Sequence, residues 1–318
     1  MSARRLLALV SLSTAMVMPV SAHAVQQSPT PKFKSSVDIV SVSAVVRDRK
    51  GRFVRDLSSA DFTVAEAGQS RKILDFRAES DGPVKLGLLM DASGSMRVGR
   101  KAVDAQAAAR HIFSALRPND EAAIFSFDTK LDRVRDFTSD IASLDASLEN
   151  VNVPYGQTSL HDAIAEAAEV VAEHARGGGR LPFRSALVVI TDGIDTKSRS
   201  TMEQVAAAAS AIDIPVYVVA VMAPIDDPNV DERPPFDAPG LTQLARGTGG
   251  EMFTASAPAH ASLAARQIVD ELRHQYVLAF EASSKSGWRS LEVRGRDPKW
   301  TVRARTGYSA GASGRPTQ

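Results

Sequence analysis

The middle of the chain alternates short, continuously apolar runs with longer segments whose apolar residues recur at helical spacing. Three of the runs are typical of strands buried on both faces: residues 85–91, 185–192 and 215–222. Segments with one apolar helical face separate or follow them: residues 101–116, 159–175, 202–212 and 260–274. Strands that alternate with helices predict an α/β fold, with a doubly wound, mostly parallel sheet covered by helices on both faces. We place this domain at residues 83–275.

Both flanks of this domain show the period-two alternation of β-strands. Residues 37–80 hold short strand candidates separated by turns, the last of them at residues 71–76. Residues 276–310 hold three more candidates, at residues 276–282, 288–296 and 300–308. Neither flank has enough strands to form a stable sheet of its own. We therefore expect the two flanks to pair in one small antiparallel β module into which the α/β domain is inserted. Two separate β caps that flank the domain are the alternative.

The chain begins with a segment that has the composition of a secretory signal peptide. Two arginines precede an apolar stretch, and Ala22-His23-Ala24 forms a small-x-small cleavage site, so the peptide is expected to span residues 1–24. A retained N-terminal anchor is the alternative. Residues 25–36 are polar and contain proline, as in a linker, and residues 311–318 are expected to be a flexible tail. An exported protein of the periplasm or the medium is predicted.

Composition narrows the class of function. Hydrophobic residues make up 44% of the 318 residues, which is enough for a packed core. The chain has no cysteine, which excludes disulfides, thiolate metal sites and cysteine nucleophiles. The formal charge is +1 and no basic cluster stands out, so we expect no nucleic-acid partner. No apolar run after the first 24 residues is long enough for a membrane span, so an integral membrane protein is not expected.

Oxygen-bearing side chains gather where the predicted strands end. Asp91 ends the first buried strand and is followed by Ser93 and Ser95 at alternate positions, while Asp192 ends the second strand. Thr158 follows a loop and precedes a helix. Ligands of doubly wound sheets bind outside the carboxyl ends of the strands, so the topology can bring these residues together. Five hard oxygen donors without nitrogen or sulfur favour Mg²⁺, Mn²⁺ or Ca²⁺ over zinc. Helix capping by Asp91, Ser93 and Ser95 is the simpler alternative.

The three pieces in this order resemble the metal-ion-dependent adhesion site of von Willebrand factor A-like domains, which have a Rossmann-like fold. The pieces are Asp91-x-Ser93-x-Ser95, Thr158 within "GQTSL" and Asp192 within "TDG". The resemblance implies that the two serines bind the metal directly, and that the threonine and the aspartates bind it directly or through water. The flanking segments are similar to those of a secreted bacterial group related to von Willebrand factor A.

The charge of the predicted site suggests a function. Two carboxylates and three hydroxyls leave residual positive charge on a divalent ion and a coordination position filled by water. An Asp or Glu carboxylate of a partner protein can take that position. We therefore expect an exported, metal-dependent protein-binding module rather than an enzyme. A Mg²⁺-dependent hydrolase is one alternative, although Ser93 stands where a phosphoryl-transfer enzyme needs a second acid. An envelope structural protein whose metal only holds the fold together is the other.

Overall fold

The computed structural model describes residues 39–78, 82–151, 155–177, 184–222, 240–283 and 285–310. The predicted signal peptide at residues 1–24, the linker at 25–36 and the tail at 311–318 lie outside these residues and stay predictions. All described residues belong to one unit of the chain, Val37–Gln318.

A six-stranded sheet forms the centre of the α/β part, with the strand order β10-β9-β8-β5-β6-β7. The first five strands of this order run parallel, and β7 alone pairs antiparallel with its neighbour. Every residue of β5 is buried, as its continuous apolar run predicts. The predicted fold class, a doubly wound and mostly parallel sheet, is thereby confirmed. The strands are β5 (Val84–Asp91), β6 (Glu121–Phe127), β7 (Leu131–Thr138), β8 (Arg184–Thr191), β9 (Val216–Val221) and β10 (Met252–Ala255).

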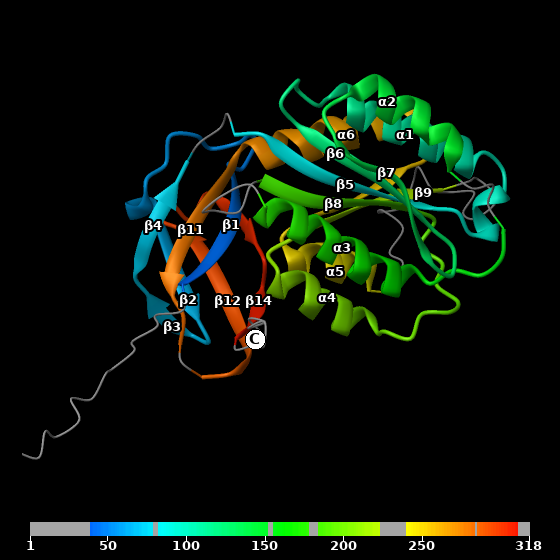
Figure 1. The fold of residues 1–318 in the computed structure, drawn as a ribbon. Coiled ribbons are helices and arrows are strands. Elements are labelled where there is room, and N and C mark those ends of the chain that lie inside the picture. Colours follow the sequence, from blue (N-terminus) through cyan, green and yellow to red (C-terminus); the bar gives the residue numbers. More distant parts are fainter. Residues whose placement is uncertain are drawn as a thin grey trace, which may run out of the picture. The chain divides into compact units, whose positions relative to one another are not determined.

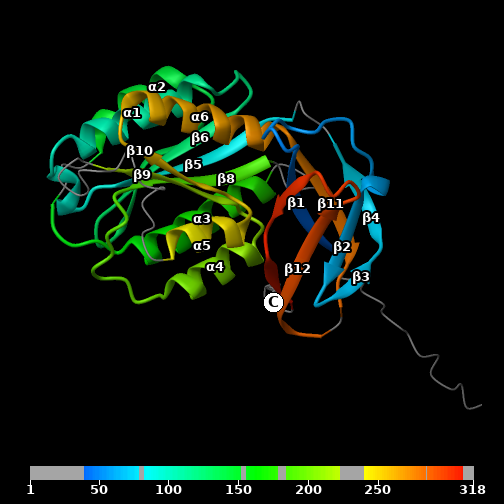
Figure 2. The ribbon, with the colours of Figure 1, turned by 180° about the vertical axis from the view of Figure 1, so that it is seen from behind.

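Helices cover both faces of this sheet. Figures 1 and 2 show α1, α2 and α6 on one face and α3, α4 and α5 on the other. Successive strand residues point to opposite faces, so Leu88 packs in one core cluster with Ile112 and Leu89 packs in the other with Val171. The helices are α1 (Lys101–Ser114), α2 (Ile141–Ser147), α3 (Leu160–Arg176), α4 (Met202–Ala211), α5 (Leu241–Thr248) and α6 (Pro258–Arg273). Short 3-10 turns occur at η1 (Ser59–Asp61), η2 (Gly94–Arg97) and η3 (Leu148–Asn150).

The remaining strands form two antiparallel sheets built from both flanks of the chain. Their orders are β13-β1-β11-β4 and β14-β12-β2-β3, so each sheet combines two N-terminal strands with two C-terminal strands. Their apolar side chains share one core, in which Val42 and Val64 lie with Leu278 and Leu291. The strands are β1 (Ile39–Arg47), β2 (Phe62–Glu66), β3 (Gln69–Arg71), β4 (Ile73–Arg77), β11 (Gln275–Glu281), β12 (Gly287–Gly295), β13 (Thr301–Ala304) and β14 (Gly307–Ala310). The flanks therefore pair with each other, and separate β caps are not what the structure shows.

Two strands expected from the sequence are each divided between these sheets. The segment 71–76 was expected to be one strand, but β3 pairs with β2 in one sheet while β4 pairs with β11 in the other. The segment 300–308 likewise splits into β13 and β14. Arg305 lies at this second division, and its buried guanidinium donates to the carbonyl oxygens of Ser41 and Ser210. Alternation along a strand does not reveal a crossing between sheets, because the apolar side chains keep facing the shared core.

No helix among the described residues has both the length and the apolar character needed to cross a membrane.

Candidate metal site

The two predicted carboxylates lie at the carboxyl ends of neighbouring strands. Asp91 is the last residue of β5, and Asp192 directly follows the last residue of β8, which pairs with β5 in parallel register. The two side chains are almost fully buried, with Asp91 4% and Asp192 3% exposed. The sheet therefore brings together two acids that are 101 residues apart in the sequence, which is the arrangement expected from a doubly wound topology.

The carboxylate of Asp91 is held by hydrogen bonds, and no ion pair joins it to a cation in the part of the chain that the structure describes. One oxygen accepts from the backbone N–H of Ser93 at 2.8 Å, and the other accepts from the hydroxyl of Thr191 at 2.6 Å. Burial raises the pKa of Asp91 to about 6; these two hydrogen bonds oppose the rise, and the negative charge of Asp192 adds to it. A buried carboxylate beside a second one is an unfavourable arrangement that a bound cation would relieve.

The two serines lie on the loop that follows Asp91. The Oγ atoms of Ser93 and Ser95 are 3.0 Å apart. The structure does not support helix capping by these residues. Ser93 precedes η2 but makes no side-chain capping bond, and α1 begins only at Lys101. The serine hydroxyls are thus hydrogen-bonded to each other and do not accept from the free N–H groups at the start of a helix.

Hydrogen bonds fix the Thr158 segment to both other pieces of the site. The N–H of Gly94, between the serines, donates to the carbonyl oxygen of Gly156 at 3.0 Å. A Cβ atom at position 94 would lie 3.0 Å from that same oxygen, so glycine permits this close approach. Thr158 is buried, at 2% exposure, and its carbonyl oxygen accepts from the N–H groups of Thr196 and Lys197, which follow Asp192 in the chain. The Thr158 segment is therefore bonded to the serine loop and to the loop after β8.

Other polar residues nearby organise the loops rather than add metal donors. Asp195 accepts from the N–H of Leu160 at 2.8 Å and caps the start of α3. Asp162 accepts from the N–H groups of Arg199 and Ser200 at 3.0 and 2.9 Å. These two acids hold the 195–200 loop against α3.

Two further residues contact the carboxylates, and no motif in the sequence singles them out. Thr191 binds Asp91, and the ammonium of Lys101 lies 3.0 Å from Oδ2 of Asp192, with both side chains almost fully buried. A lysine at the start of a helix is usually exposed, and nothing in its local pattern marks this one as buried. Only the fold shows that the first turn of α1 faces the end of β8.

The donors of this site suit a hard divalent cation. Within the described part of the chain, no group of three or more His, Cys, Asp or Glu side chains could hold a metal ion. The candidate site differs from such a group because it has only two carboxylates, and its other donors are hydroxyls. Oxygen donors of this kind fit Mg²⁺, Mn²⁺ or Ca²⁺. The ammonium bound to Asp192 shows that the site already attracts positive charge.

Comparison with known proteins agrees with this topology. The family model of the von Willebrand factor type A domain matches residues 86–194, which include all five candidate donors. The chain contains a von Willebrand factor A-like domain. A search of curated proteins finds no match to this chain.

Three solved structures illustrate what the A-like domain is similar to. The conserved hypothetical protein BatB from Bacteroides thetaiotaomicron is 19% identical, covers 59% of this chain and 98% of its own, and has a TM-score of 0.48. A von Willebrand factor type A protein from Catenulispora acidiphila is 11% identical, with 88% and 76% covered and a TM-score of 0.47. The vWF domain of the type V pili tip protein Mfa5 from Porphyromonas gingivalis is 20% identical, with 38% and 42% covered and a TM-score of 0.31. The assignment rests on the family match and the observed strand order, because these structures are only distantly similar.

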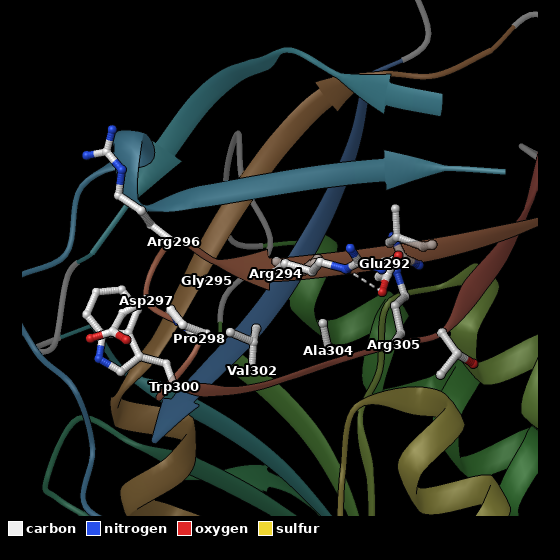
Figure 3. Close-up of a pocket in the computed structure, with 13 residues that line it drawn as sticks. Glu292, Arg294, Gly295, Arg296, Asp297, Pro298, Trp300, Val302, Ala304 and Arg305 are labelled. Atoms are coloured by element: carbon white, nitrogen blue, oxygen red, sulfur yellow. Dashed lines mark hydrogen bonds and ion pairs between the residues drawn. The ribbon is translucent and has the colours of Figure 1, made fainter. Parts of the chain in front are cut away.

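A hollow of about 500 Å³ lies elsewhere, on the antiparallel module beside β12 and β13 (Figure 3). Its charged lining residues are largely paired: Arg294 binds Glu292 at 2.6 Å, and Arg305 binds Asp213 at 3.3 Å. None of the five candidate donors of the A-like domain lines this hollow. It therefore adds nothing to the candidate metal site.

Proposed function

We propose that the A-like domain is an exported, metal-dependent protein-docking module. The divalent cation, Mg²⁺ or alternatively Mn²⁺ or Ca²⁺, would be held by Asp91, Ser93, Ser95, Thr158 and Asp192. When bound, the ion would supply a positive centre with a free coordination position for an Asp or Glu carboxylate of a partner protein. The observation that carries the proposal is the pair of buried carboxylates at the ends of β5 and β8, with Asp91 held by the N–H of Ser93 and the hydroxyl of Thr191 and by no cation among the described residues.

The surroundings of the site support a protein as the partner. Several of the large apolar side chains exposed on the described surface belong to the segments that carry the site. Tyr155 is 75% exposed, Ile194 is 45% exposed, and Val98 is 39% exposed. They come from the loop before Thr158, the loop after Asp192 and the end of the serine loop. Exposed apolar side chains on the loops that carry a polar site are typical of surfaces that bind proteins.

The site residues have distinct parts in this function. Asp91 must be ionised to bind the cation, and its bonds to Ser93 and Thr191 hold its two oxygens in fixed directions. Asp192 is shared between the cation and Lys101. The hydrogen bonds among the three loops hold the donor segments in place before a ligand arrives, which lowers the entropic cost of binding.

Titration calorimetry with Mg²⁺ tests the metal site, and Asp91→Asn and Asp192→Asn are the informative variants. We expect binding by the wild-type protein and a loss of at least about tenfold in affinity in each variant, because each removes a charged ligand. Asp162→Asn is the matched control, since Asp162 holds the 195–200 loop and is not a proposed donor. Wild-type affinity in both site variants would contradict the metal site.

Pull-down from the envelope fraction of the source cell, in Mg²⁺ and in chelator, tests docking. Retention of a partner only in Mg²⁺, by a protein whose circular dichroism is unchanged by chelator, supports docking. Unfolding in chelator supports the alternative in which the metal holds the fold together. Mg²⁺-dependent hydrolysis of phosphate esters that is lost in Asp91→Asn would support the hydrolase alternative instead.

A further inference from the structure

Thr191 carries a fully buried hydroxyl in contact with a proposed metal ligand. It is the last residue of β8, it is 0% exposed, and its hydroxyl donates to Oδ2 of Asp91 at 2.6 Å. Met90 and Ile190 are partners in the parallel register of β5 and β8, which lie side by side in Figure 1. Asp91 and Thr191 are the next residue of each strand, so their side chains point to the same face of the sheet. The strand register therefore creates this contact.

The same hydroxyl joins Asp91 to the loop that carries Asp192. The backbone N–H of Gly193 donates to Oγ1 of Thr191 at 2.9 Å. A hydroxyl has a single hydrogen, and the carboxylate receives it, so hydrogen bonds run in one direction from Gly193 through Thr191 to Asp91. A methyl group in place of the hydroxyl would leave both the N–H and the carboxylate oxygen without this partner. Thr191 thus ties the end of β5 to the loop after β8.

Both oxygens of the Asp91 carboxylate are fixed by the protein. Oδ1 accepts from the N–H of Ser93 at 2.8 Å, and Oδ2 accepts from Thr191. The two donors come from different segments of the chain, so the carboxylate cannot turn freely without losing one of them. A buried oxygen that loses its donor is unfavourable. Asp91 is therefore held in one orientation before any ion binds.

A fixed carboxylate affects Mg²⁺ and Ca²⁺ differently. Ca²⁺ takes about six to eight oxygens at about 2.3–2.6 Å in adaptable geometry, often with both oxygens of one carboxylate, whereas Mg²⁺ demands near-octahedral geometry at about 2.0–2.1 Å. If each carboxylate gives one oxygen, the five proposed donors supply five, and a water or a partner carboxylate completes the octahedron. Ca²⁺ would gain further donors only if a carboxylate turned to bind through both oxygens.

We propose that Thr191 is a positioning residue that makes the site prefer Mg²⁺ to Ca²⁺. This inference rests on the proposed function, and it selects one of the ions that the donor chemistry allows. Thr191 acts through Asp91 and not as a ligand: its hydroxyl keeps the carboxylate in the orientation that suits the smaller ion. Without the hydroxyl, Asp91 can turn. Mg²⁺ then loses a pre-positioned ligand, while Ca²⁺ gains a carboxylate that can adapt to it.

Thr191→Val tests this role, because valine keeps the branched shape of threonine and lacks the hydroxyl. Calorimetry measures the affinity of the protein for Mg²⁺ and for Ca²⁺, each added as the chloride. We expect wild type to bind Mg²⁺ more tightly than Ca²⁺. Thr191→Val should bind Mg²⁺ about tenfold more weakly, as is usual when a group that orients a metal ligand is removed, and should lose much less affinity for Ca²⁺. Thr191→Ser keeps the hydroxyl and should restore the wild-type ratio of the two affinities.

Thr248→Val is the matched control. Thr248 is also buried, at 3% exposure, and its hydroxyl accepts from the N–H of Val216 at 3.0 Å and donates to the carbonyl oxygen of Leu244 at 3.0 Å. Val216 is the first residue of β9, so this contact lies away from the carboxyl ends of the strands. Thr248→Val should lower the melting temperature and leave both metal affinities as in wild type. Thr191→Ala is a second variant without the hydroxyl, to be used if Thr191→Val does not fold by circular dichroism, and it should behave like Thr191→Val.

The outcomes separate the two proposals. Wild-type Mg²⁺ affinity in Thr191→Val, or tighter binding of Ca²⁺ than of Mg²⁺ by wild type, would overturn the role of Thr191 and leave the metal site intact. Equal losses of Mg²⁺ and Ca²⁺ affinity would also overturn it, because general loosening of a site does not select between ions. If Thr191→Ser behaves like Thr191→Val, the hydroxyl is not the cause. Absence of binding of either ion to wild type would overturn the metal site and this inference together.

Discussion

Two buried aspartates of this chain differ in what neutralises them. Asp120 is 1% exposed and binds Arg273 at 2.6 Å; burial raises its pKa, but the hydrogen bonds from Arg273 and from two backbone N–H groups outweigh burial and lower it. Asp91 is similarly buried, yet no described arginine pairs with it, and burial raises its pKa to about 6. An ion pair such as that of Asp120 stabilises the fold. A buried carboxylate without a cation lowers stability, and such sites concentrate at functional centres.

Asp91 should make the stability of the metal-free protein depend on pH in a direction opposite to that of an ordinary carboxylate. Its folded pKa of about 6 lies above the ordinary aspartate pKa of 3.8, so between these two pH values the folded state binds a proton that the unfolded state has lost. The free energy of unfolding should therefore fall as pH rises from 4 through 6 and then level off. When the pH is lowered from 7 to 5 in chelator, the free energy of unfolding of wild type should rise by about 1 kcal/mol more than that of Asp91→Asn, since the amide does not titrate. Thermal melts in matched buffers measure the difference.

Saturating Mg²⁺ provides the control for this pH effect. Metal binding requires ionised Asp91, so the stabilisation by Mg²⁺ should be larger at pH 7 than at pH 5. If the free energies of unfolding of wild type and Asp91→Asn change in parallel with pH in chelator, the Asp91 carboxylate has an ordinary pKa and burial does not raise it.

The residues of the site differ in how visible they are in the sequence. Asp91, Ser93 and Ser95 are adjacent on one loop, so their spacing alone suggests shared ligation. Lys101 lies only six positions beyond Ser95, but its burial results from the packing of α1 beside α6 on one face of the sheet. Local patterns do not record such packing.

At the scale of elements, buried strands were easier to predict than antiparallel ones. The runs that became β5, β8 and β9 are apolar at nearly every position, because helices cover both of their faces. The divisions between β3 and β4 and between β13 and β14 were not predicted, since each needs a change of partner rather than a change of periodicity. Helix α2 was also not expected; Asp140 caps it by accepting from the N–H of Ser143, yet its seven residues are too few for a clear helical pattern.

Gly250 marks a close contact between elements that an added methyl group should disrupt. A Cβ atom there would overlap the carbonyl oxygen of Val216, the first residue of β9, and a backbone atom of a central strand cannot move aside easily. Gly250→Ala should lower the free energy of unfolding by about 3 kcal/mol through overpacking. Gly247→Ala is the matched control, because it lies in α5 with its nearest contact, Thr306 Oγ1, at 3.8 Å. It should remain within about 1 kcal/mol of wild type. Similar denaturant midpoints for the two variants would contradict this reading of the contact.

At the scale of the whole described chain, a charged network joins the antiparallel strands to the A-like domain. Glu271 of α6 is fully buried and binds Arg47 of β1 at 2.7 Å and Arg303 of β13. Arg303 also binds Glu251, just before β10. The backbone N–H of Thr306 donates to the carbonyl oxygen of Gly247 in α5. Breaking a buried ion pair by removing one partner is strongly destabilising, so the two parts should support each other's folding.

Two optical signals can follow these parts separately. The two tryptophans of the chain, Trp288 and Trp300, lie in β12 and just before β13, so their fluorescence reports on the antiparallel strands. All described α-helices belong to the α/β part, so circular dichroism at 222 nm reports mainly on the A-like domain. We expect both signals to change at the same temperature, as they do when a chain unfolds in a single cooperative step. Saturating Mg²⁺ should raise both transition temperatures together, because a ligand stabilises every part that unfolds with its site.

Glu271→Gln removes the buried charge at the centre of this network, so it should lower the free energy of unfolding by about 2–3 kcal/mol or separate the two transitions. Glu292→Gln is the control, because Glu292 forms an exposed pair with Arg294, and it should change the free energy of unfolding by less than about 0.5 kcal/mol. In wild type, a fluorescence transition at a lower temperature than the circular dichroism transition, and unchanged by Mg²⁺, would show that the antiparallel strands unfold independently. The network around Glu271 would then be a local contact without a cooperative role.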